Sequence, residues 1–514
     1  MKHAGFPPSD GKGGTVIVVG AGIGGLCAAL RLAHAGLNVS VLERHGAPGG
    51  KMRQVGGVDA GPTVLTMRDV FDTLFADVGT RTEDHVSLIP QSVLARHWWP
   101  DGSTLDLHAD RARNTEAIAK LAGPREARAF EAFSKRARTL FDGFDAPVMR
   151  NPAPQFNQLA SLAFRQPALF RAMAPTKTLA ALLQGTFSDP RLRQLFGRYA
   201  TYVGGSPYKS PALLSLIWEA EAAGVWCVRG GMHALAKAIA QLAKDKGAEF
   251  RYSCHASRIL TDSSGVTGVA LEDGTVLPTD HVVFNGDPRA LASGLLGRET
   301  QGVAAASAKT PRSLSANVWS FAANATGLDL AHHNVFFCAD PQREFSDIEN
   351  GRLPSDPTLY LCAEDRGQGT PPPATERFEI IANAPPLTRR TPQPEDPETC
   401  RQQTFQTLER FGLSMDPWPG PGCLTTPADF DRLFPGSSGS LYGQSPHGMT
   451  AALDRPVATT AIPGLVLAGG GVHPGAGVPM AAISGGHAAA AILRGPTSTS
   501  RSRQTAMPGG TSTA

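Results

Sequence analysis

The stretch TVIVVGAGIGGLCAALRLAHAGLNVSVLE, residues 15–43, decides the fold of this chain. Its first five residues form a β-branched run that is typical of a buried parallel strand. Gly20, Gly22 and Gly25 then fill the pattern G-x-G-x-x-G, and an Ala- and Leu-rich helix follows. A second strand, NVSVLE, ends on Glu43. This order of strand, glycine turn, helix, strand and acid is typical of a dinucleotide-binding Rossmann unit.

Each part of this pattern has a physical role. The glycines allow a tight turn, the close approach of a pyrophosphate and the packing of helix on strand. The helix N-terminus offers free N–H groups and the positive end of its dipole to the phosphates. Glu43 stands at the spacing at which a carboxylate binds a ribose 2′-OH. Arg44 beside it is a further candidate cofactor contact and raises the alternative of NADP, which Glu43 disfavours because its charge would repel a 2′-phosphate.

Length and composition limit the remaining possibilities. A chain of 514 residues exceeds one typical domain, so two are expected. A net charge of +3 without a dense Lys/Arg run argues against a nucleic-acid partner. The seven cysteines never stand in C-x-x-C spacing, which indicates reduced thiols in a cytosolic protein and argues against a metal site or disulfides. No apolar run approaches the ~20 residues of a membrane-spanning helix, and residues 1–14 and 496–514 are expected to be flexible tails.

Two further glycine-rich segments point to a long cofactor. RHGAPGGKMRQ carries Gly49 and Gly50, which allow close backbone approach, and either Lys51 or Arg53 is expected to meet a phosphate or a flavin edge. The alternative is a surface turn with solvated cations. Near the other end of the chain, GLVLAGGGVHPGAGVPMAAISGG predicts a strand, a glycine turn and a helix that begins at Pro479. An NAD enzyme has no need of this second helix start, whereas the flavin ring of FAD does.

The middle of the chain is predicted to be mixed. Helical periodicity dominates residues 70–224, and short strands joined by turns at Gly265 and Gly274 follow a helix in 225–300. Segment 156–183 combines large apolar residues with Arg and Lys and contains no acid. An apolar face flanked by cations can lie in a membrane interface. The alternative is a helix that faces the core and has a solvated basic side.

Taken together, these motifs resemble the flavin-dependent carotenoid (phytoene-type) desaturases, which are relatives of the amine oxidases. The resemblance covers nearly the whole chain and rests on the glycine-turn block, VDAGPTVLT, YVGGSPYKSPA, PADFDRLFPGSSGSLYGQSPHG and AGGGVHPGAGVPMAAISG. Within that family it is strongest to the 1-hydroxycarotenoid 3,4-desaturases, or methoxyneurosporene dehydrogenases. Those enzymes belong to the spheroidene and spirilloxanthin type of pathway in photosynthetic bacteria.

The resemblance implies an α/β fold in which a Rossmann-like FAD-binding domain of the amine-oxidase type carries an inserted α+β domain. The FAD-binding domain is expected to be discontinuous, with segments 15–70, 225–300 and 430–495. Segments 71–224 and 301–429 are expected to form the domain that binds the substrate and docks on the membrane.

The resemblance also assigns cofactor contacts. They are the pyrophosphate-facing Gly20, Gly22 and Gly25; Glu43 and Arg44 at the ribose; Gly49, Gly50 and Lys51 in the second loop; Ala256, where relatives usually have Val beside the adenine; and Gly469, Gly470, Gly477, Val478 and Met480 near the ribityl chain and flavin. Met480 departs from relatives that often have Gly at its position. His473, Tyr208 and Lys209 are interpreted as structural, and we expect neither a catalytic side chain nor a metal ligand.

The implied reaction removes two hydrogens from adjacent carbons of an apolar carotenoid such as 1-hydroxyneurosporene, with a hydride going to FAD. The protein would take this substrate from the surface of the inner or photosynthetic membrane on the cytoplasmic side, which favours membrane docking for segment 156–183. Oxygen or a quinone would accept the electrons, and the sequence does not determine the oligomeric state. The alternatives are a phytoene or neurosporene desaturase, a flavin amine or protoporphyrinogen oxidase, a flavin-free prenyl-binding protein of the Rab-escort type, and an NAD(P) dehydrogenase.

Overall fold

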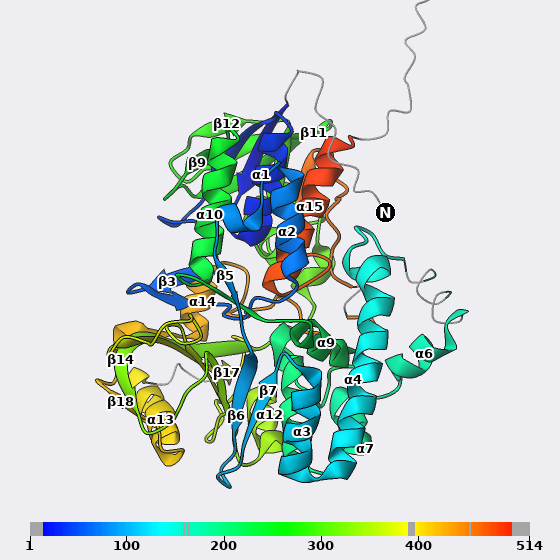
Figure 1. Ribbon diagram of the computed structural model, residues 1–514. Helices are drawn as coiled ribbons and strands as arrows, with labels where there is room; N and C mark the ends of the chain where they lie inside the picture. Colours follow the sequence, from blue (N-terminus) through cyan, green and yellow to red (C-terminus); the bar gives the residue numbers. More distant parts are fainter. Residues whose placement is uncertain are drawn as a thin grey trace, which may run out of the picture.

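The structure is a computed structural model with two parts, one built around a parallel sheet and one around a larger mixed sheet (Figure 1). It describes residues 14–388 except 156, 158–160 and 162–164, together with residues 396–451 and 454–495. The predicted tails therefore lie outside the described residues, apart from Gly14.

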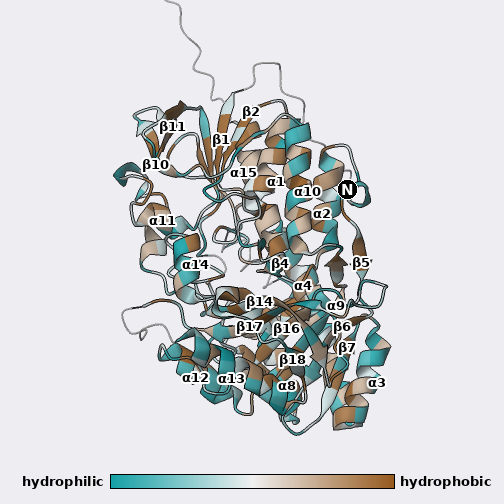
Figure 2. Cartoon of the chain, turned by 90° about the vertical axis from the view of Figure 1, so that its left-hand side faces the viewer, coloured by the Kyte–Doolittle hydropathy of each residue, from teal (hydrophilic) through white to brown (hydrophobic). Residues whose placement is uncertain are grey.

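The parallel sheet brings together strands from the beginning, the middle and the end of the chain. Its five strands follow the order β20 (Leu465–Leu467), β13 (His281–Phe284), β1 (Thr15–Val19), β2 (Asn38–Leu42) and β9 (Glu249–Arg251). Each neighbouring pair is parallel, and these strands carry hydrophobic residues because both faces of the sheet are covered (Figure 2). The predicted Rossmann unit is thus confirmed, and β13 returns to its sheet from the middle of the chain.

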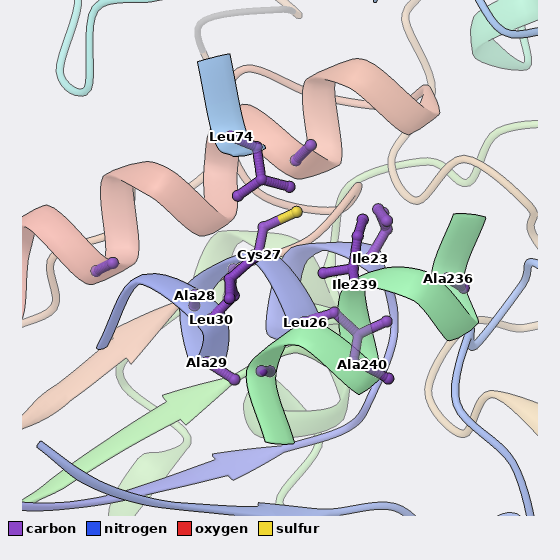
Figure 3. Packing of buried hydrophobic residues seen from close by; sticks show 14 of the residues in the cluster. Ile23, Leu26, Cys27, Ala28, Ala29, Leu30, Leu74, Ala236, Ile239 and Ala240 are labelled. Atoms are coloured by element: carbon purple, nitrogen blue, oxygen red, sulfur yellow. The ribbon is translucent and has the colours of Figure 1, made fainter. Parts of the chain in front are cut away.

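Four helices cover one face of this sheet. They are α1 (Ile23–His34), α2 (Arg68–Asp77), α10 (Met232–Asp245) and α15 (Val478–Leu493). Figure 3 shows α1 in the middle of this layer, where Leu26 packs beside Ile239 and Cys27 beside Leu74. The helices α1 and α15 approach closely because Gly485 has no side chain: a Cβ there would lie 2.2 Å from the Gly24 carbonyl oxygen.

The other face of the parallel sheet packs against a small antiparallel sheet. Its strands are β10 (Ala256–Asp262), β11 (Gly265–Leu271) and β12 (Val276–Pro278). As the sequence predicted, turns join these strands at Gly265, which begins β11 directly after its turn, and at Gly274; both glycines have positive φ. Ile259 and Val269 from this sheet join Val282 and Leu465 in one buried cluster.

The second part is built on an eight-stranded sheet. Its strands run in the order β18 (Ser414–Asp416), β14 (Ser315–Thr326), β17 (Glu376–Ala384), β16 (Leu359–Ala363), β15 (His333–Phe336), β6 (Val93–Trp98) and β7 (Thr104–His108), with β19 (Leu424–Thr425) paired to β14. Strands β6 and β7 lie inside the region where helical periodicity was expected to dominate. The sequence feature that indicates these two strands is Asp101-Gly102, a hairpin turn between two runs in which apolar and polar residues alternate.

Helices from the middle of the chain surround this sheet. They are α3 (Arg111–Ala122), α4 (Pro124–Phe144), α6 (Pro167–Met173), α7 (Leu179–Thr186), α8 (Pro190–Gly197), α9 (Leu216–Ala222), α12 (Pro341–Glu349) and α13 (Pro397–Arg410), with the 3₁₀ segment η3 (Arg198–Val203). Two short pairs, β3 (Arg53–Val55) with β4 (Val58–Ala60) and β5 (Leu88–Pro90) with β8 (Trp226–Val228), and the helices α11 (Pro288–Ala292) and α14 (Pro427–Leu433) complete the described elements that concern the site.

Candidate cofactor and substrate site

The predicted glycine turn lies at the carboxyl end of β1, and its surroundings explain why it needs glycine. Gly20 has a φ of +99°, which side-chain-bearing residues rarely adopt. A Cβ at Gly25 would lie 2.2 Å from the Gly20 carbonyl oxygen, and one at Gly22 would lie 2.8 Å from the Asn285 amide nitrogen. Gly20 and Gly22 line the large cavity of the molecule, whereas Gly25 lies behind them in the packing of α1.

Asn285 lies between this turn and the late glycine loop, and no sequence motif marks it. Its side-chain amide donates a hydrogen bond to the Gly20 carbonyl oxygen at 3.1 Å. Its carbonyl oxygen lies 2.8 Å from the position that a Cβ on Gly469 would take. One side chain after β13 is therefore hydrogen-bonded to the first loop and packed closely against the second, which stands at the opposite end of the chain. The only sequence signal was its place at the end of a returning strand.

Glu43 and Arg44 lie at the carboxyl end of β2 and both line the cavity. Glu43 is buried, and its two oxygens accept hydrogen bonds from the backbone N–H groups of Ala21, at 2.7 Å, and His45, at 2.9 Å. Each carboxylate oxygen keeps a further lone pair for a ribose hydroxyl. Nη1 of Arg44 is buried and has no hydrogen-bond partner among the described residues, so it has a donor to offer to a polar ligand.

The second predicted loop packs directly on the first. The Gly49 N–H donates to the Ala21 carbonyl oxygen at 2.8 Å, and Gly49 and Gly50 both have positive φ. Lys51 is held by the carbonyl oxygens of Ser440 and Leu441, so it is not a solvated surface lysine. Burial lowers the pKa of Lys51 from 10.5 to about 8.

Two arginines and one aspartate surround Lys51. Arg312 forms a buried ion pair with Asp287, and Arg455 donates to the carbonyl oxygens of Gly470 at 2.9 Å and Tyr442 at 3.1 Å. Within the described residues, these three cations share a single close carboxylate, so this side of the cavity carries excess positive charge. Neither arginine was predicted: Arg312 donates to a carbonyl oxygen 125 positions later, and Arg455 donates to carbonyl oxygens 13 and 15 positions away.

The late glycine loop and the start of α15 form the neighbouring wall. Gly469 and Gly477 have φ values of +107° and +112°, and both line the cavity together with Gly470 and Val478. The first turn of α15 therefore points its free N–H groups toward the cavity. Met480 is not among the lining residues; its side chain approaches Gly477 instead. Ala256, at the start of β10, is buried and lines the opposite end beside Cys254 and His255.

These segments share one cavity of about 520 Å³, which is in the usual range for small-molecule sites. It continues from the glycine turn to the inner face of the large sheet, where Val318, Val335, Tyr360 and Ile381 line it. Most of its lining at that end is apolar. A charged group formed by Arg198, Tyr202 and Glu221 lies in this lining, which also contains the uncharged polar residues Thr63, Thr201, Tyr360 and Asn383.

A hydrogen-bonded chain of side chains leads away from the cavity. Thr63 and Tyr360 both line it, and their hydroxyl oxygens lie 2.6 Å apart. The Tyr360 hydroxyl lies 2.6 Å from Nδ1 of the buried His333. Burial raises the pKa of Tyr360 well above its usual value and lowers the pKa of His333 well below, so both are neutral at neutral pH. This chain was also missed, because its members come from three separate segments.

The residues interpreted as structural do have structural contacts. Nε2 of His473 lies 3.0 Å from the Val148 carbonyl oxygen and 2.9 Å from that of Asn151. Lys209 forms an ion pair with Glu349 at 2.8 Å, and Tyr208 stacks edge-on against Phe345. None of His473, Tyr208 and Lys209 is among the residues that line the large cavity.

The residues present fit an FAD molecule. The bare glycine backbone makes room for a pyrophosphate, the excess of cations near Lys51 offsets anionic charge, and Arg44 has an unused donor. The open sheet carries its crevice at the carboxyl ends of β1 and β2, where such folds bind dinucleotides. Together with the apolar extension of the same cavity, this site defines an FAD-dependent oxidoreductase.

Comparisons with known proteins identify the family. Residues 23–493 match the family described as flavin containing amine oxidoreductase, and the chain belongs to it. Proteins named hydroxyneurosporene desaturase are similar over nearly the full length. The one from Cereibacter sphaeroides is 56% identical and covers 95% of this chain and 99% of its own. The one from Rhodobacter capsulatus is 51% identical, with 93% and 97% covered, and the one from Rubrivivax gelatinosus is 45% identical, with 97% of each covered.

Solved structures agree on the fold. Cyclohexylamine oxidase from Brevibacterium oxydans superposes with a TM-score of 0.56 at 16% identity and covers 94% of this chain and 99% of its own. A fatty acid isomerase from P. acnes gives a TM-score of 0.54 at 14% identity, with 93% and 98% covered. The predicted amine-oxidase type of α/β fold, the predicted cofactor FAD and the resemblance to the carotenoid desaturases are confirmed.

Proposed function

We propose that this protein is an FAD-dependent carotenoid desaturase that introduces the C-3,4 double bond into acyclic 1-hydroxy or 1-methoxy carotenoids such as 1-hydroxyneurosporene. The observation that carries the proposal is the single cavity that joins the dinucleotide turn to an apolar chamber on the large sheet. A rigid polyene needs such a chamber, and the likeness to hydroxyneurosporene desaturases at 45% to 56% identity supports the same substrate class. The alternatives of an amine or protoporphyrinogen oxidase are not favoured.

The reaction breaks one C–H bond on each of two adjacent carbons and forms a C=C double bond. FAD, when bound, supplies the two-electron acceptor for a hydride. The second hydrogen leaves as a proton to solvent. Loss of a hydride beside a polyene leaves a delocalised cation whose neighbouring C–H is acidic, so a strong base is unnecessary. Tyr360 and His333 are both neutral and hydrogen-bonded to each other. They can hold a proton in position within a hydrogen bond, but they are not suited to keep the proton that the substrate releases.

The chain's own residues contribute position and charge. The first turn of α15 and the cations around Lys51 favour negative charge at their side of the cavity. The apolar side chains Val318, Val335 and Ile381 exclude water from the substrate side. The predicted contacts that line the cavity remain our proposed cofactor-binding residues, namely Gly20, Gly22, Glu43, Arg44, Gly49, Gly50, Lys51, Ala256, Gly469, Gly470, Gly477 and Val478. Gly25 and Met480 were also predicted and do not line the cavity. The division into segments 15–70, 225–300 and 430–495 against the rest also remains a prediction.

The decisive experiment is anaerobic incubation of the flavin-loaded protein with defined carotenoids in liposomes. We expect bleaching near the flavin band together with a product that has one more conjugated double bond when 1-hydroxyneurosporene is supplied. Phytoene should give no product. Conversion of phytoene in preference to 1-hydroxyneurosporene would favour the alternative of a phytoene desaturase. Reoxidation of the bleached protein by oxygen or by a quinone then identifies the electron acceptor.

We also propose that the protein docks on the cytoplasmic side of the membrane through the region around α6. No described helix is long and apolar enough to cross a membrane. Phe170 on α6 is 53% exposed, and Arg171 and Lys177 beside it are exposed cations. Such a combination suits an interfacial surface. Leu162 and Phe164, which belong to the predicted docking segment, lie outside the described residues.

Liposome sedimentation tests the docking surface. Phe170→Ser combined with Arg171→Glu should reduce the bound fraction on anionic vesicles and leave the flavin content unchanged. Val276 on β12, which is 55% exposed and does not line the cavity, offers the control Val276→Ser. Equal binding of the double variant and the wild type would reject α6 as the docking site.

A further inference from the structure

A charged and hydrogen-bonded group lies in the apolar half of the cavity, where a hydrocarbon substrate gives it no partner. Arg198 and Tyr202 come from η3 and Glu221 from α9, and all three line the cavity. Their neighbours in the lining include Ile217, Ala220 and Val335. Burying an ionised pair in such a place costs desolvation free energy, so we expect the pair to have a function that offsets this cost.

The hydrogen bonds of this group are complete on the acidic side. The Tyr199 hydroxyl donates to one oxygen of Glu221 at 2.7 Å, and the Tyr202 hydroxyl donates to the other at 2.5 Å. Burial raises the pKa of Tyr199 and the pKa of Tyr202, so both phenols stay protonated as donors. Glu221 is 2% exposed and thus holds the two tyrosines in fixed positions.

The basic side is incomplete. The Arg198 guanidinium lies 5.1 Å from the ring centroid of Tyr202 and 5.6 Å from that of Tyr199, which are cation–π distances. Its Nε and Nη2 atoms are buried and have no hydrogen-bond partner among the described residues. Buried guanidinium donors are rarely left without an acceptor, because each lost hydrogen bond costs free energy.

The unused groups of the cluster match one functional group. Nε and Nη2 of Arg198 are donors to spare, and the Tyr202 oxygen, which donates its own proton to Glu221 and lies within hydrogen-bonding reach of the guanidinium, is an acceptor for a hydroxyl placed between them. An aliphatic hydroxyl both accepts and donates one hydrogen bond, so it satisfies both sides at once. A hydrocarbon satisfies neither.

We propose that Arg198 and Tyr202 bind the hydroxyl group of a 1-hydroxycarotenoid and thereby select the hydroxylated end of the substrate. This inference rests on the proposed function. In such a substrate the hydroxyl-bearing carbon is C-1 and the bond that is oxidised is C-3,4, so only C-2 separates the anchor from the reacting pair. An anchor that holds the hydroxyl therefore determines which carbon–carbon bond lies at the flavin. The same contact then sets both the preference for a hydroxylated carotenoid and the position of the new double bond.

The competing explanation is that the group only fastens η3 to α9. Both explanations predict a loss of stability when the group is disrupted, but they differ in selectivity. A binding role changes the preference between a hydroxylated and an unhydroxylated carotenoid, whereas a fastening role lowers the activity on both carotenoids by the same factor.

The test compares kcat/KM for 1-hydroxyneurosporene and for neurosporene, which lacks the hydroxyl, in liposomes with flavin-loaded enzyme. The ratio of the two values should fall by about ten- to a hundredfold in Arg198→Leu, since the lost hydrogen bond involves a charged donor. It should fall by a smaller factor in Tyr202→Phe. The matched control is Arg193→Leu on α8, because Arg193 does not line the cavity; its ratio should equal that of the wild type.

The outcomes separate this inference from the function on which it rests. If wild-type enzyme desaturates both carotenoids with equal kcat/KM, or if both variants keep the wild-type ratio, the hydroxyl anchor is wrong while the desaturase function stands. If wild-type enzyme desaturates no carotenoid, both fail. If Arg198→Leu does not retain flavin, the ratio in the milder Tyr202→Phe decides the matter.

Discussion

Lys51 offers a sharp test of the electrostatics of the cofactor site. Its ammonium group is buried against the carbonyl oxygens of Ser440 and Leu441, and Arg312 and Arg455 add like charge nearby. Burial lowers the pKa of Lys51 from 10.5 to about 8. The folded, flavin-free protein therefore releases this proton near pH 8, while the unfolded chain keeps it until about pH 10.5. Lys51→Met removes the titrating group.

The magnitude follows from the shift in the pKa. Between pH 8 and pH 10.5 the unfolded chain binds more protons than the folded protein, so the free energy of unfolding rises with pH in this window. The full shift corresponds to about 3 kcal/mol. Between pH 7.5 and pH 9.5 the wild type should gain about 2 kcal/mol relative to Lys51→Met, because most of that window lies between the two pKa values.

Urea unfolding of the flavin-free proteins at pH 7.5 and pH 9.5 measures this difference. The exposed Lys237 on α10 provides the matched control, and Lys237→Met should follow the wild type at both pH values. Bound FAD should flatten the pH dependence of the wild type, because its negative charge favours the protonated amine. A free-energy difference between wild type and Lys51→Met that stays constant from pH 7.5 to 9.5 would refute the assignment of Lys51 as a buried, perturbed cation.

Three further predictions concern the glycine turn, Asn285 and Glu364, a buried acid that accepts a hydrogen bond from the Asp59 N–H and pairs with Arg377. Gly25→Ala should abolish flavin retention, because its Cβ would lie 2.2 Å from a backbone oxygen. The control Gly46→Ala, with no atom within 4 Å of its Cβ, should retain flavin. Retention is measured as the ratio of flavin to protein absorbance. Asn285→Ala should weaken FAD binding by about 1–3 kcal/mol in a fluorescence titration, since it leaves the Gly20 carbonyl oxygen without its donor. Burial raises the pKa of Glu364 from 4.5 to about 7. The wild type should thus lose about 3 kcal/mol of unfolding free energy relative to Glu364→Gln as pH rises from 4.5 to above 7, and parallel pH profiles of the two proteins would contradict this.

The parts of the site that the sequence predicted are those that a few consecutive residues determine. The turn at Gly20, the acid at Glu43 and the strand–turn–helix around Gly477 each follow from local backbone geometry, and local patterns are visible in a sequence. Gly25 supports the turn from behind instead of lining the cavity, because the third glycine of the pattern serves helix packing. Met480, like Gly25, lies next to residues that line the cavity but does not line it itself.

The parts that were missed depend on contacts between distant segments. Asn285 donates to a residue 265 positions earlier, and Tyr360 contacts a hydroxyl 297 positions earlier. Such contacts arise only once the sheet has formed, so the spacing of residues along the sequence does not predict them. Arg198 and Glu221 are closer together, but each stands in an ordinary helical segment without a motif. The buried donors of Arg198 that lack a partner are apparent only from the three-dimensional lining of the cavity.

The charge pattern of the cavity matches two ligands of different character. At the cofactor end, Lys51, Arg312 and Arg455 share the single carboxylate of Asp287 among the described residues near them, and the excess positive charge suits an anionic dinucleotide. At the substrate end, Arg198 is balanced by Glu221, so no net charge faces a neutral molecule there. Excess charge without a counter-ion would be costly in an apolar chamber, whereas a balanced pair with spare hydrogen-bonding groups can recognise a hydroxyl. The electrostatics therefore assign an anion to one half of the cavity and an uncharged, weakly polar molecule to the other.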